Sequence, residues 1–304
     1  MADELKSPDL AANASLIEEL FSDVTKWEGS LAGGQKLDEG GAALRSLKET
    51  KVQFGNPRAN LVAITAEQLH GSGIELSSIQ TQQLESSHDF YFMTITVDMR
   101  PEPGAQFKAL ACELNFGPKG VDEPIVQSIF PKTLWKNVMT FGGGMNLGLD
   151  ADLNWKVGVD ASKLSALSDK APELSANLEN KNDMKSHIVL HDFSYDLGRF
   201  DIAASGEDNS ECYWYIQNAE LQQMLTTKFS LVFKVPKGTK EFTLTGKAWA
   251  EPSMSWLTAN VRNVFGNLGG KFQDLFRKRD EAASDLAQGA AETWTLPLPG
   301  SAVG

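Results

Sequence analysis

The chain has 304 residues, of which 41% are hydrophobic and 22% charged, a composition typical of a globular protein with a large core. The formal net charge of −12 argues against nucleic-acid binding, because a phosphate backbone is bound through clustered Lys and Arg. No apolar run approaches the roughly 18 residues of a transmembrane helix, and the first residues lack a signal-peptide pattern. We therefore expect a cytoplasmic protein, although export without a leader would leave no trace in this sequence.

Residues 1–50 are predicted to form an N-terminal helical segment. From Ser15 onward, apolar side chains recur at helical spacing. They are Leu16, Ile17, Leu20, Phe21, Val24 and Trp27. Asn13 or Ser15 is expected to cap the start of this helix, and Gly29 to end it. A glycine-rich loop over residues 31–42 should follow, with a short second helix near residues 43–47.

Residues 51–255 are predicted to form the core of an antiparallel β-sandwich, because apolar and polar residues alternate there. Strands are expected at residues 61–65, 90–99, 107–116, 211–217, 229–235 and 242–250. In residues 90–116 and again in residues 229–250, a strand, a turn with Pro and Gly, and a strand that opens with Phe follow one another. We interpret both as hairpins, and they suggest two related β units.

Residues 145–161 alternate without exception between an apolar and a polar parity. The apolar parity consists of Met145, Leu147, Leu149, Ala151, Leu153, Trp155, Val157, Val159 and Ala161. Because ordinary strands have about 5–6 residues, this segment is either one unusually long strand or a hairpin that folds back near residues 150–154. Residues 187–204 are expected to pair with it, after an excursion of helix and loop at residues 162–186.

Residues 256–304 are predicted to form a C-terminal amphipathic helix and a tail. Apolar residues from Leu257 to Phe276 lie within about a third of a helical wheel. Residues 256–280 contain five basic and two acidic residues, so this part of an acidic chain is locally positive. Residues 294–298 could add an edge strand, which invites β-addition between subunits.

The tail supplies the candidate residues for facing a membrane or a protein partner. They are Phe265, Leu268, Phe272, Leu275, Phe276, Lys271, Arg277 and Lys278. If the apolar members are buried within the folded monomer, this interpretation loses its support.

Metal sites are weakly indicated. Asp150, Asp152 and Asn154 match the opening of a calcium loop, but Trp155 and Ala161 replace its glycine and its bidentate glutamate. A second weak candidate is the loop that carries Glu207, Asp208 and Glu211. Ordinary solvent-facing residues explain both patterns, so we expect no cofactor, with calcium as the alternative.

Catalytic signatures are lacking. The sequence has no GxxxxGK[ST], HExxH or GxSxG motif. His187 and His191 lie on a predicted strand, where their spacing separates the Cα atoms by roughly 13 Å. Cys112 and Cys212 fall on apolar strand positions, which predicts buried thiols, with a disulfide between them as the alternative.

The sequence therefore predicts a mainly β protein, a β-dominated α+β fold built on an antiparallel β-sandwich with amphipathic helices near both termini. The expected function is non-catalytic binding of a protein partner or self-assembly into a homo-oligomer. The alternative is a membrane-active, pore-forming or lipid-surface-binding protein that inserts a β-hairpin around residues 145–204. A hydrolase without a visible motif is the third interpretation.

Overall fold

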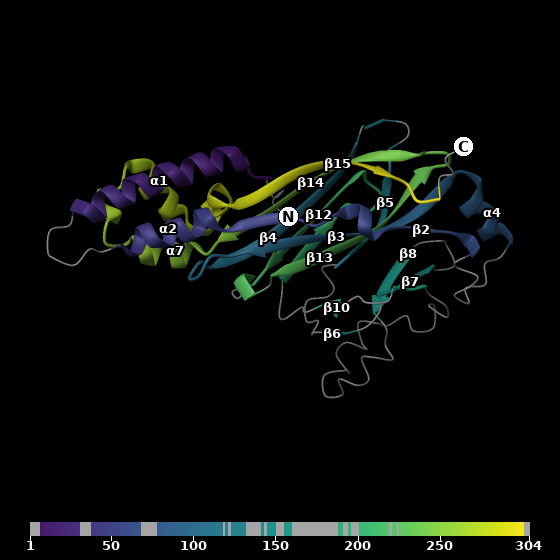
Figure 1. Cartoon of the computed structure of the whole chain (residues 1–304), viewed down its shortest axis with the longest axis horizontal. Helices are drawn as coiled ribbons and strands as arrows, with labels where there is room; N and C mark the ends of the chain where they lie inside the picture. The colour runs from purple at the N-terminus through teal and green to yellow at the C-terminus, as the bar shows by residue number, and fades with distance from the viewer. Residues whose placement is uncertain are drawn as a thin grey trace.

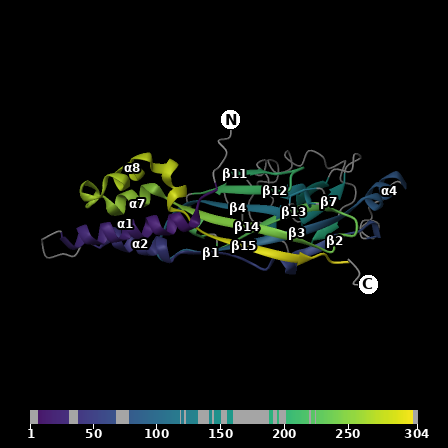
Figure 2. The same cartoon turned by 90° about the horizontal axis from the view of Figure 1, so that it is seen from above.

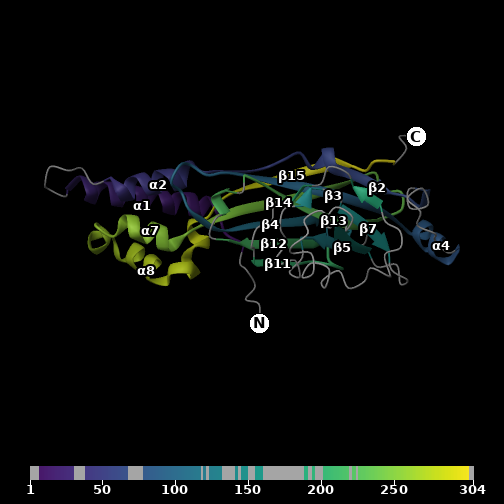
Figure 3. The same ribbon diagram turned by 90° about the horizontal axis from the view of Figure 1, so that it is seen from below.

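The computed structural model describes residues 7–30, 38–67, 78–117, 119–120, 123–131, 141–142, 145–149, 155–159, 188–190, 194–195, 201–218, 221–223 and 225–300. Two antiparallel sheets, sheet A and sheet B, form a sandwich whose strands run along the long axis of the molecule (Figure 1). The helices from the two terminal parts of the chain gather at one end of the sandwich (Figures 2 and 3). The predicted fold class is confirmed.

Both sheets are built from sequence-distant strands. Sheet A has the order β1-β3-β13-β5, with β2 also paired to β3: β1 (Lys51–Phe54), β2 (Leu61–Ile64), β3 (His88–Arg100), β5 (Ile125–Phe130) and β13 (Thr226–Pro236). Sheet B has the order β11-β12-β4-β14-β15: β4 (Phe107–Gly117), β11 (Asp201–Ser205), β12 (Glu211–Gln217), β14 (Glu241–Pro252) and β15 (Gln288–Pro297). The predicted edge strand in the tail is present as β15, which begins earlier than expected.

The strand alternation selects the residues that fill the space between the sheets. Trp214 of β12 lies with its ring centroid 5.1 Å from that of Phe229 of β13. The ring centroids of Phe116 of β4 and Phe233 of β13 are 5.0 Å apart. All four side chains are fully buried, so aromatic contacts between the sheets dominate this core.

The two predicted hairpins are wrong, although their strands are present. β3 lies in sheet A and β4 in sheet B, and β13 and β14 are divided in the same way. β3 pairs with β13 instead, and β4 pairs with β14, so corresponding strands of the two units are neighbours. Gly104 and Gly238 in the connections have φ angles of 87° and 84°, which glycine adopts without strain. Alternation specifies which face of a strand is buried, and it leaves the neighbouring strand open.

Strand β5 was not predicted, because its sequence does not alternate strictly. The register between β5 and β13 shifts between Val232 and Phe233. This irregularity lets Val126 and Ile129, three positions apart, both reach the buried interior.

We call the helices α1 (Leu10–Ser30), α2 (Glu39–Glu49), α7 (Met254–Val261) and α8 (Gly270–Lys278) the helical end. The predicted caps of α1 are wrong, because the helix begins before Asn13 and Ser15. Asp9 caps it, and its Oδ1 accepts hydrogen bonds from the backbone N–H groups of Ala11 and Ala12 at 3.0 and 3.1 Å.

Helix α2 begins within the predicted glycine-rich loop, at Glu39. The carboxylate of Glu28 on α1 accepts hydrogen bonds from the N–H groups of Gly40 and Gly41, at 2.7 and 2.9 Å. Because these N–H groups have no partner within the helix, a side chain from α1 supplies the cap that α2 lacks. The loop prediction is therefore wrong from Glu39 onward.

The single tail helix predicted over residues 256–280 is divided in the structure. A 3₁₀ turn (Phe265–Asn267) separates α7 from α8. The N–H of Gly269, which precedes α8, donates to Oδ2 of Asp23 at 3.1 Å. The glycines in this stretch therefore interrupt the helix, and the apolar stripe continues on two shorter helices.

Helix α4 (Ser78–Ser86) lies at the opposite end of the molecule from the helical end (Figures 1 and 2). Among the described residues, no helix has both the length and the apolar character needed to cross a bilayer.

Candidate functional site

The alternating segment folds back on itself, which is the second of the two predicted alternatives. β7 (Met145–Leu149) pairs antiparallel with β8 (Trp155–Val159). Met145 lies opposite Val159 and Leu149 opposite Trp155. The apolar positions of β7 are therefore paired with the apolar positions of β8, and the polar positions with the polar ones.

A third strand pairs with the other edge of β7, so the predicted pairing of residues 187–204 with this segment is confirmed at β9. It is wrong at β11, which pairs with β12 in sheet B. β9 (Ile188–Leu190) places Leu190 opposite Met145. A few residues beyond β9, β10 (Ser194–Tyr195) pairs with β6 (Phe141–Gly142), which lies a few residues before β7, and Tyr195 lies opposite Phe141. We call β7, β8 and β9 the ribbon.

The ribbon lies beside the outer face of sheet A, where β8 contacts β5 (Figures 1 and 3). An outer sandwich face is normally solvated, yet Phe92, Val232 and Phe130 on this face are at most 5% exposed. Thr94 and Ser230 are also buried there, and their hydroxyl oxygens lie 2.9 Å apart. The middle of sheet A is therefore covered on both faces.

The apolar tail candidates are buried in the folded monomer, so in this conformation they are not presented to a membrane or a partner. Leu268, Phe272, Leu275 and Phe276 are at most 8% exposed and belong to the main core. Phe265 is half-buried, with its ring centroid 6.1 Å from that of Phe276. The stripe is amphipathic because α7 and α8 pack into the helical end.

The basic tail candidates remain at the surface. Lys271 forms an ion pair with Glu19 of α1, and Arg277 lies 3.3 Å from Asp274 on its own helix. Lys278 is exposed at the C-terminal end of α8, where a cation stabilises the helix dipole. Structural roles therefore account for the local positive charge.

The calcium candidates Asp150, Asp152 and Asn154 lie outside the described residues, as do His187 and His191. The second calcium candidate does not form a cluster, since no group of three His, Cys, Asp or Glu residues that could hold a metal ion occurs among the described residues. Glu211 instead interacts with Asn115, whose amide lies 3.1 Å away, and with Lys119.

Cys112 and Cys212 are both buried, as predicted, and they are free thiols. Burial raises the pKa of both thiols, and the proximity of Cys212 contributes to the raised pKa of Cys112. A thiol held protonated in the core is a poor nucleophile, so neither residue is suited to catalysis.

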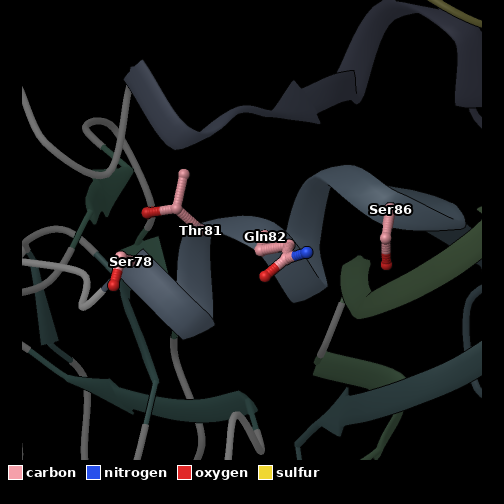
Figure 4. Close-up of a pocket in the computed structure, with 4 residues that line it drawn as sticks. All are labelled: Ser78, Thr81, Gln82 and Ser86. Carbon is pink, nitrogen blue, oxygen red and sulfur yellow. The ribbon is translucent and has the colours of Figure 1, made fainter.

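An open hollow of about 510 Å³ lies along α4 (Figure 4). The side chains of Ser78, Thr81, Gln82 and Ser86 line it. All four are uncharged at any pH near neutrality, so they offer hydrogen bonds without an acid, a base or an activated nucleophile.

Sequence reasoning missed a buried polar group on the outer side of sheet B. Glu251 is 3% exposed and accepts a hydrogen bond from the hydroxyl of Tyr215 at 2.8 Å. Trp249 donates to the same carboxylate at 3.4 Å, and Lys108 lies 4.0 Å away. These contacts join β4, β12 and β14, and strand alternation carries no signal for them.

No family model matches the chain, and no curated protein matches it. Among solved structures, the chain is similar to the Clostridium perfringens delta-toxin, with 9% identity, 67% of this chain and 78% of that chain covered, and a TM-score of 0.35. The Clostridium perfringens NetB toxin in the membrane inserted form is 8% identical, with 67% of this chain and 85% of that chain covered and a TM-score of 0.27. The collagen binding subdomain of the Enterococcus faecalis surface protein ACE is 8% identical, with 70% of this chain and 89% of that chain covered and a TM-score of 0.25. Likeness this low carries no argument about function.

Proposed function

We propose that this protein is membrane-active and that the ribbon is the part that enters the bilayer. The observation that carries the proposal is the unbroken alternation of residues 145–161, in which the two described strands, β7 and β8, pair antiparallel at the side of the sandwich. An amphipathic β-hairpin is the smallest unit from which strands can cross a membrane.

The two sheets are joined to each other at the edge next to the ribbon, without the ribbon taking part. The chain leaves sheet A after β5 and re-enters sheet B at β11. Between β5 of sheet A and the turn after β11 of sheet B, the N–H of Val126 donates to the carbonyl oxygen of Asn209 at 2.9 Å. The N–H of Asp208 donates to the carbonyl oxygen of Val126 at 2.8 Å. The ribbon can therefore move without opening the edge from which it leaves.

Dye release from loaded vesicles of phosphatidylcholine, with and without phosphatidylserine, tests this proposal. We expect the protein to release the dye and Leu147→Arg to abolish release, because a lipid-facing Arg costs about 2–4 kcal/mol at the bilayer midplane. Asn146→Arg is the matched control on the neighbouring, polar parity, and it should still release dye.

Circular dichroism must first show that both variants are folded. The proposal is wrong if the unmodified protein releases no dye from either kind of vesicle. It is also wrong if Leu147→Arg and Asn146→Arg release dye equally well.

Self-assembly through sheet B is the second candidate function, because β15 is an end strand of that sheet. Its register with β14 is continuous over ten residues, and Glu292 is its one charged residue. Such an edge is a template for adding a strand from another chain. Light scattering should then detect an oligomer that Ala291→Lys dissociates, while Thr245→Lys on the adjacent strand leaves it intact. A monomer under all conditions contradicts this second function.

A further inference from the structure

We infer that the hydroxyl of Ser128 helps the ribbon to leave the sandwich, because it is buried beside the ribbon without a hydrogen-bond partner among the described residues. This inference rests on the proposed function, since it concerns the step in which the ribbon moves away. It goes further by assigning control of this step to side chains of sheet A.

The register of sheet A places Ser128 on the outer face of that sheet. Phe229 of β13 faces sheet B, where its ring contacts that of Trp214. Side chains alternate along a strand, so Val232, three positions later, faces outward. Ser128 of β5 lies directly opposite Val232, and directly paired residues point to the same face. Ser128 therefore points away from sheet B.

Other buried side chains surround Ser128 on this outer face. We call the whole group the covered patch, which consists of two rows of directly paired residues: Phe92, Val232 and Ser128, and Thr94, Ser230 and Phe130. Every member is at most 5% exposed, although β5 is an end strand of sheet A. An outer sheet face is open to water unless another element lies over it, and β8 of the ribbon contacts β5 (Figure 3). The ribbon therefore takes part in burying the covered patch.

The polar half of the covered patch weakens this burial. The hydroxyl oxygens of Thr94 and Ser230 lie 2.9 Å apart, so these two groups form a hydrogen bond with each other. Ser128 Oγ has no partner among the described residues. A buried hydroxyl without a partner loses the hydrogen bonds that water would supply, which costs free energy. The covered state carries this cost, and the state in which the ribbon has moved away does not.

The apolar half of the covered patch acts in the opposite direction. Phe92, Phe130 and Val232 favour the covered state, because uncovering would expose them to water. Replacing Ser128 by an apolar residue of the same size would strengthen the cover further. The serine therefore makes the contact between the ribbon and sheet A weaker than an apolar patch of the same shape would be.

A thiol placed in the covered patch measures how often the patch is uncovered. Val232→Cys is suitable, because position 232 is fully buried opposite Ser128 and Cys is a small hydrophobe like Val. Ellman's reagent reaches this thiol only after uncovering, so the labelling rate follows the population of the uncovered state. Cys112 and Cys212 lie in the main core and report global unfolding of the same molecule. Circular dichroism confirms that each variant is folded.

Two substitutions in this Val232→Cys background should change the labelling rate in opposite directions. Ser128→Ala should slow labelling at position 232 about tenfold, because the covered state no longer contains the unpartnered hydroxyl. Thr94→Val should speed labelling about tenfold, because it leaves the hydroxyl of Ser230 without its partner in the covered state only.

Thr227→Val is the matched control. Thr227 is 1% exposed, and its hydroxyl also has no partner among the described residues. This residue shares the parity of Phe229, so it faces the interior of the sandwich. Removing its hydroxyl relieves a cost that is present with or without the ribbon in place. Thr227→Val should therefore raise stability in urea denaturation, as Ser128→Ala does, and leave labelling at position 232 unchanged.

The inference is wrong if Ser128→Ala leaves the labelling rate unchanged, or if Thr227→Val slows labelling as much as Ser128→Ala. It is also wrong if position 232 reacts no sooner than the native thiols, because the patch is then uncovered only by global unfolding. These measurements contain no lipid, so they do not depend on membrane activity. With vesicles of phosphatidylcholine and phosphatidylserine, Ser128→Ala should slow dye release and Thr94→Val should speed it. If labelling changes as expected and the unmodified protein releases no dye, the proposed function fails and the effect of Ser128 on the cover stands.

Discussion

The helical end and the ribbon are both amphipathic in sequence, but they differ in what their residues contact. In the helical end, apolar side chains of α8 are buried in the main core, and Glu28 of α1 caps α2. In the ribbon, three short strands pair with one another, and β8 reaches the sandwich at β5. An amphipathic pattern therefore indicates that the apolar face of a segment is buried against something. Only the packing shows whether that face is buried within the core of the monomer.

This difference has an energetic consequence. A two-stranded hairpin is marginally stable by itself, and β9 adds only three residues to the pair of β7 and β8, whereas helices that share a core with a sandwich unfold with it. Substitutions in the helical end should therefore cost stability. Substitutions in the ribbon should cost membrane activity while the sandwich stays folded.

The largest expected effect follows from removing the aromatic ring of Phe272. This side chain is 4% exposed in the core, so Phe272→Ala should lower the free energy of unfolding by about 3–5 kcal/mol. Urea denaturation followed by tryptophan fluorescence measures the change. Phe265→Ala is the matched control, and it should cost less because Phe265 is only half-buried.

The same pair of variants separates cis packing from membrane contact. If Phe272→Ala keeps its stability and loses binding to vesicles, the tail acts at the membrane and our description of the helical end is wrong.

Much of the fold was predictable from the sequence, because strand alternation follows burial. Residues 90–99 and 107–116 were correctly predicted as strands, yet they lie in opposite sheets, since alternation says nothing about pairing. The position of the ribbon hairpin was one of two predicted alternatives, and choosing between them required the register of β7 with β8.

The tail stripe was recognised correctly as amphipathic, but the sequence did not indicate that its apolar side lies in the core of the monomer. Its apolar residues have the same pattern whether they face a neighbouring helix, a partner or lipid. The buried polar residues Asn13 and Glu28 had one signal available. They continue the helical spacing of Ile17, Leu20 and Val24 at the two ends of the stripe, which marks them as facing inward.

The second prediction concerns Asn13, which joins α1 to the segment before β15. Its side-chain amide donates to the carbonyl oxygens of Ser284 and Ala287, at 2.6 and 3.3 Å. Asn13→Ala removes the donor to the buried carbonyl of Ala287 and one donor to the partly buried carbonyl of Ser284, so it should lower the free energy of unfolding by about 1–3 kcal/mol in urea denaturation. Ser15→Ala, an exposed change in the same helix, should stay within about 0.5 kcal/mol. Equal effects for both variants would show that Asn13 does not anchor the helix.

The third prediction compares thiols in the sandwich with a thiol in the ribbon. Because burial raises the pKa of Cys112 and Cys212, the folded protein should not react with Ellman's reagent at neutral pH. Both thiols should react after unfolding in guanidinium chloride. Asn146→Cys should add a thiol that reacts in the folded protein within the time that the native thiols stay protected. Rapid reaction of the unmodified protein would mean that the sandwich opens as readily as the ribbon.

The smallest expected effect is the pH dependence contributed by His88 at the start of β3. Burial and then the charge of Lys234 lower its pKa from 6.5, while Asp89 acts in the opposite direction. The unfolded chain therefore binds a proton at a higher pH than the folded chain, so stability falls as the pH drops from about 6.5 toward the folded pKa. Following the His88 ring protons by NMR during titration of the folded protein should give a midpoint below that of a model histidine. His88→Gln should remove this part of the pH dependence in urea denaturation, and a midpoint above 6.5 would reverse the sign.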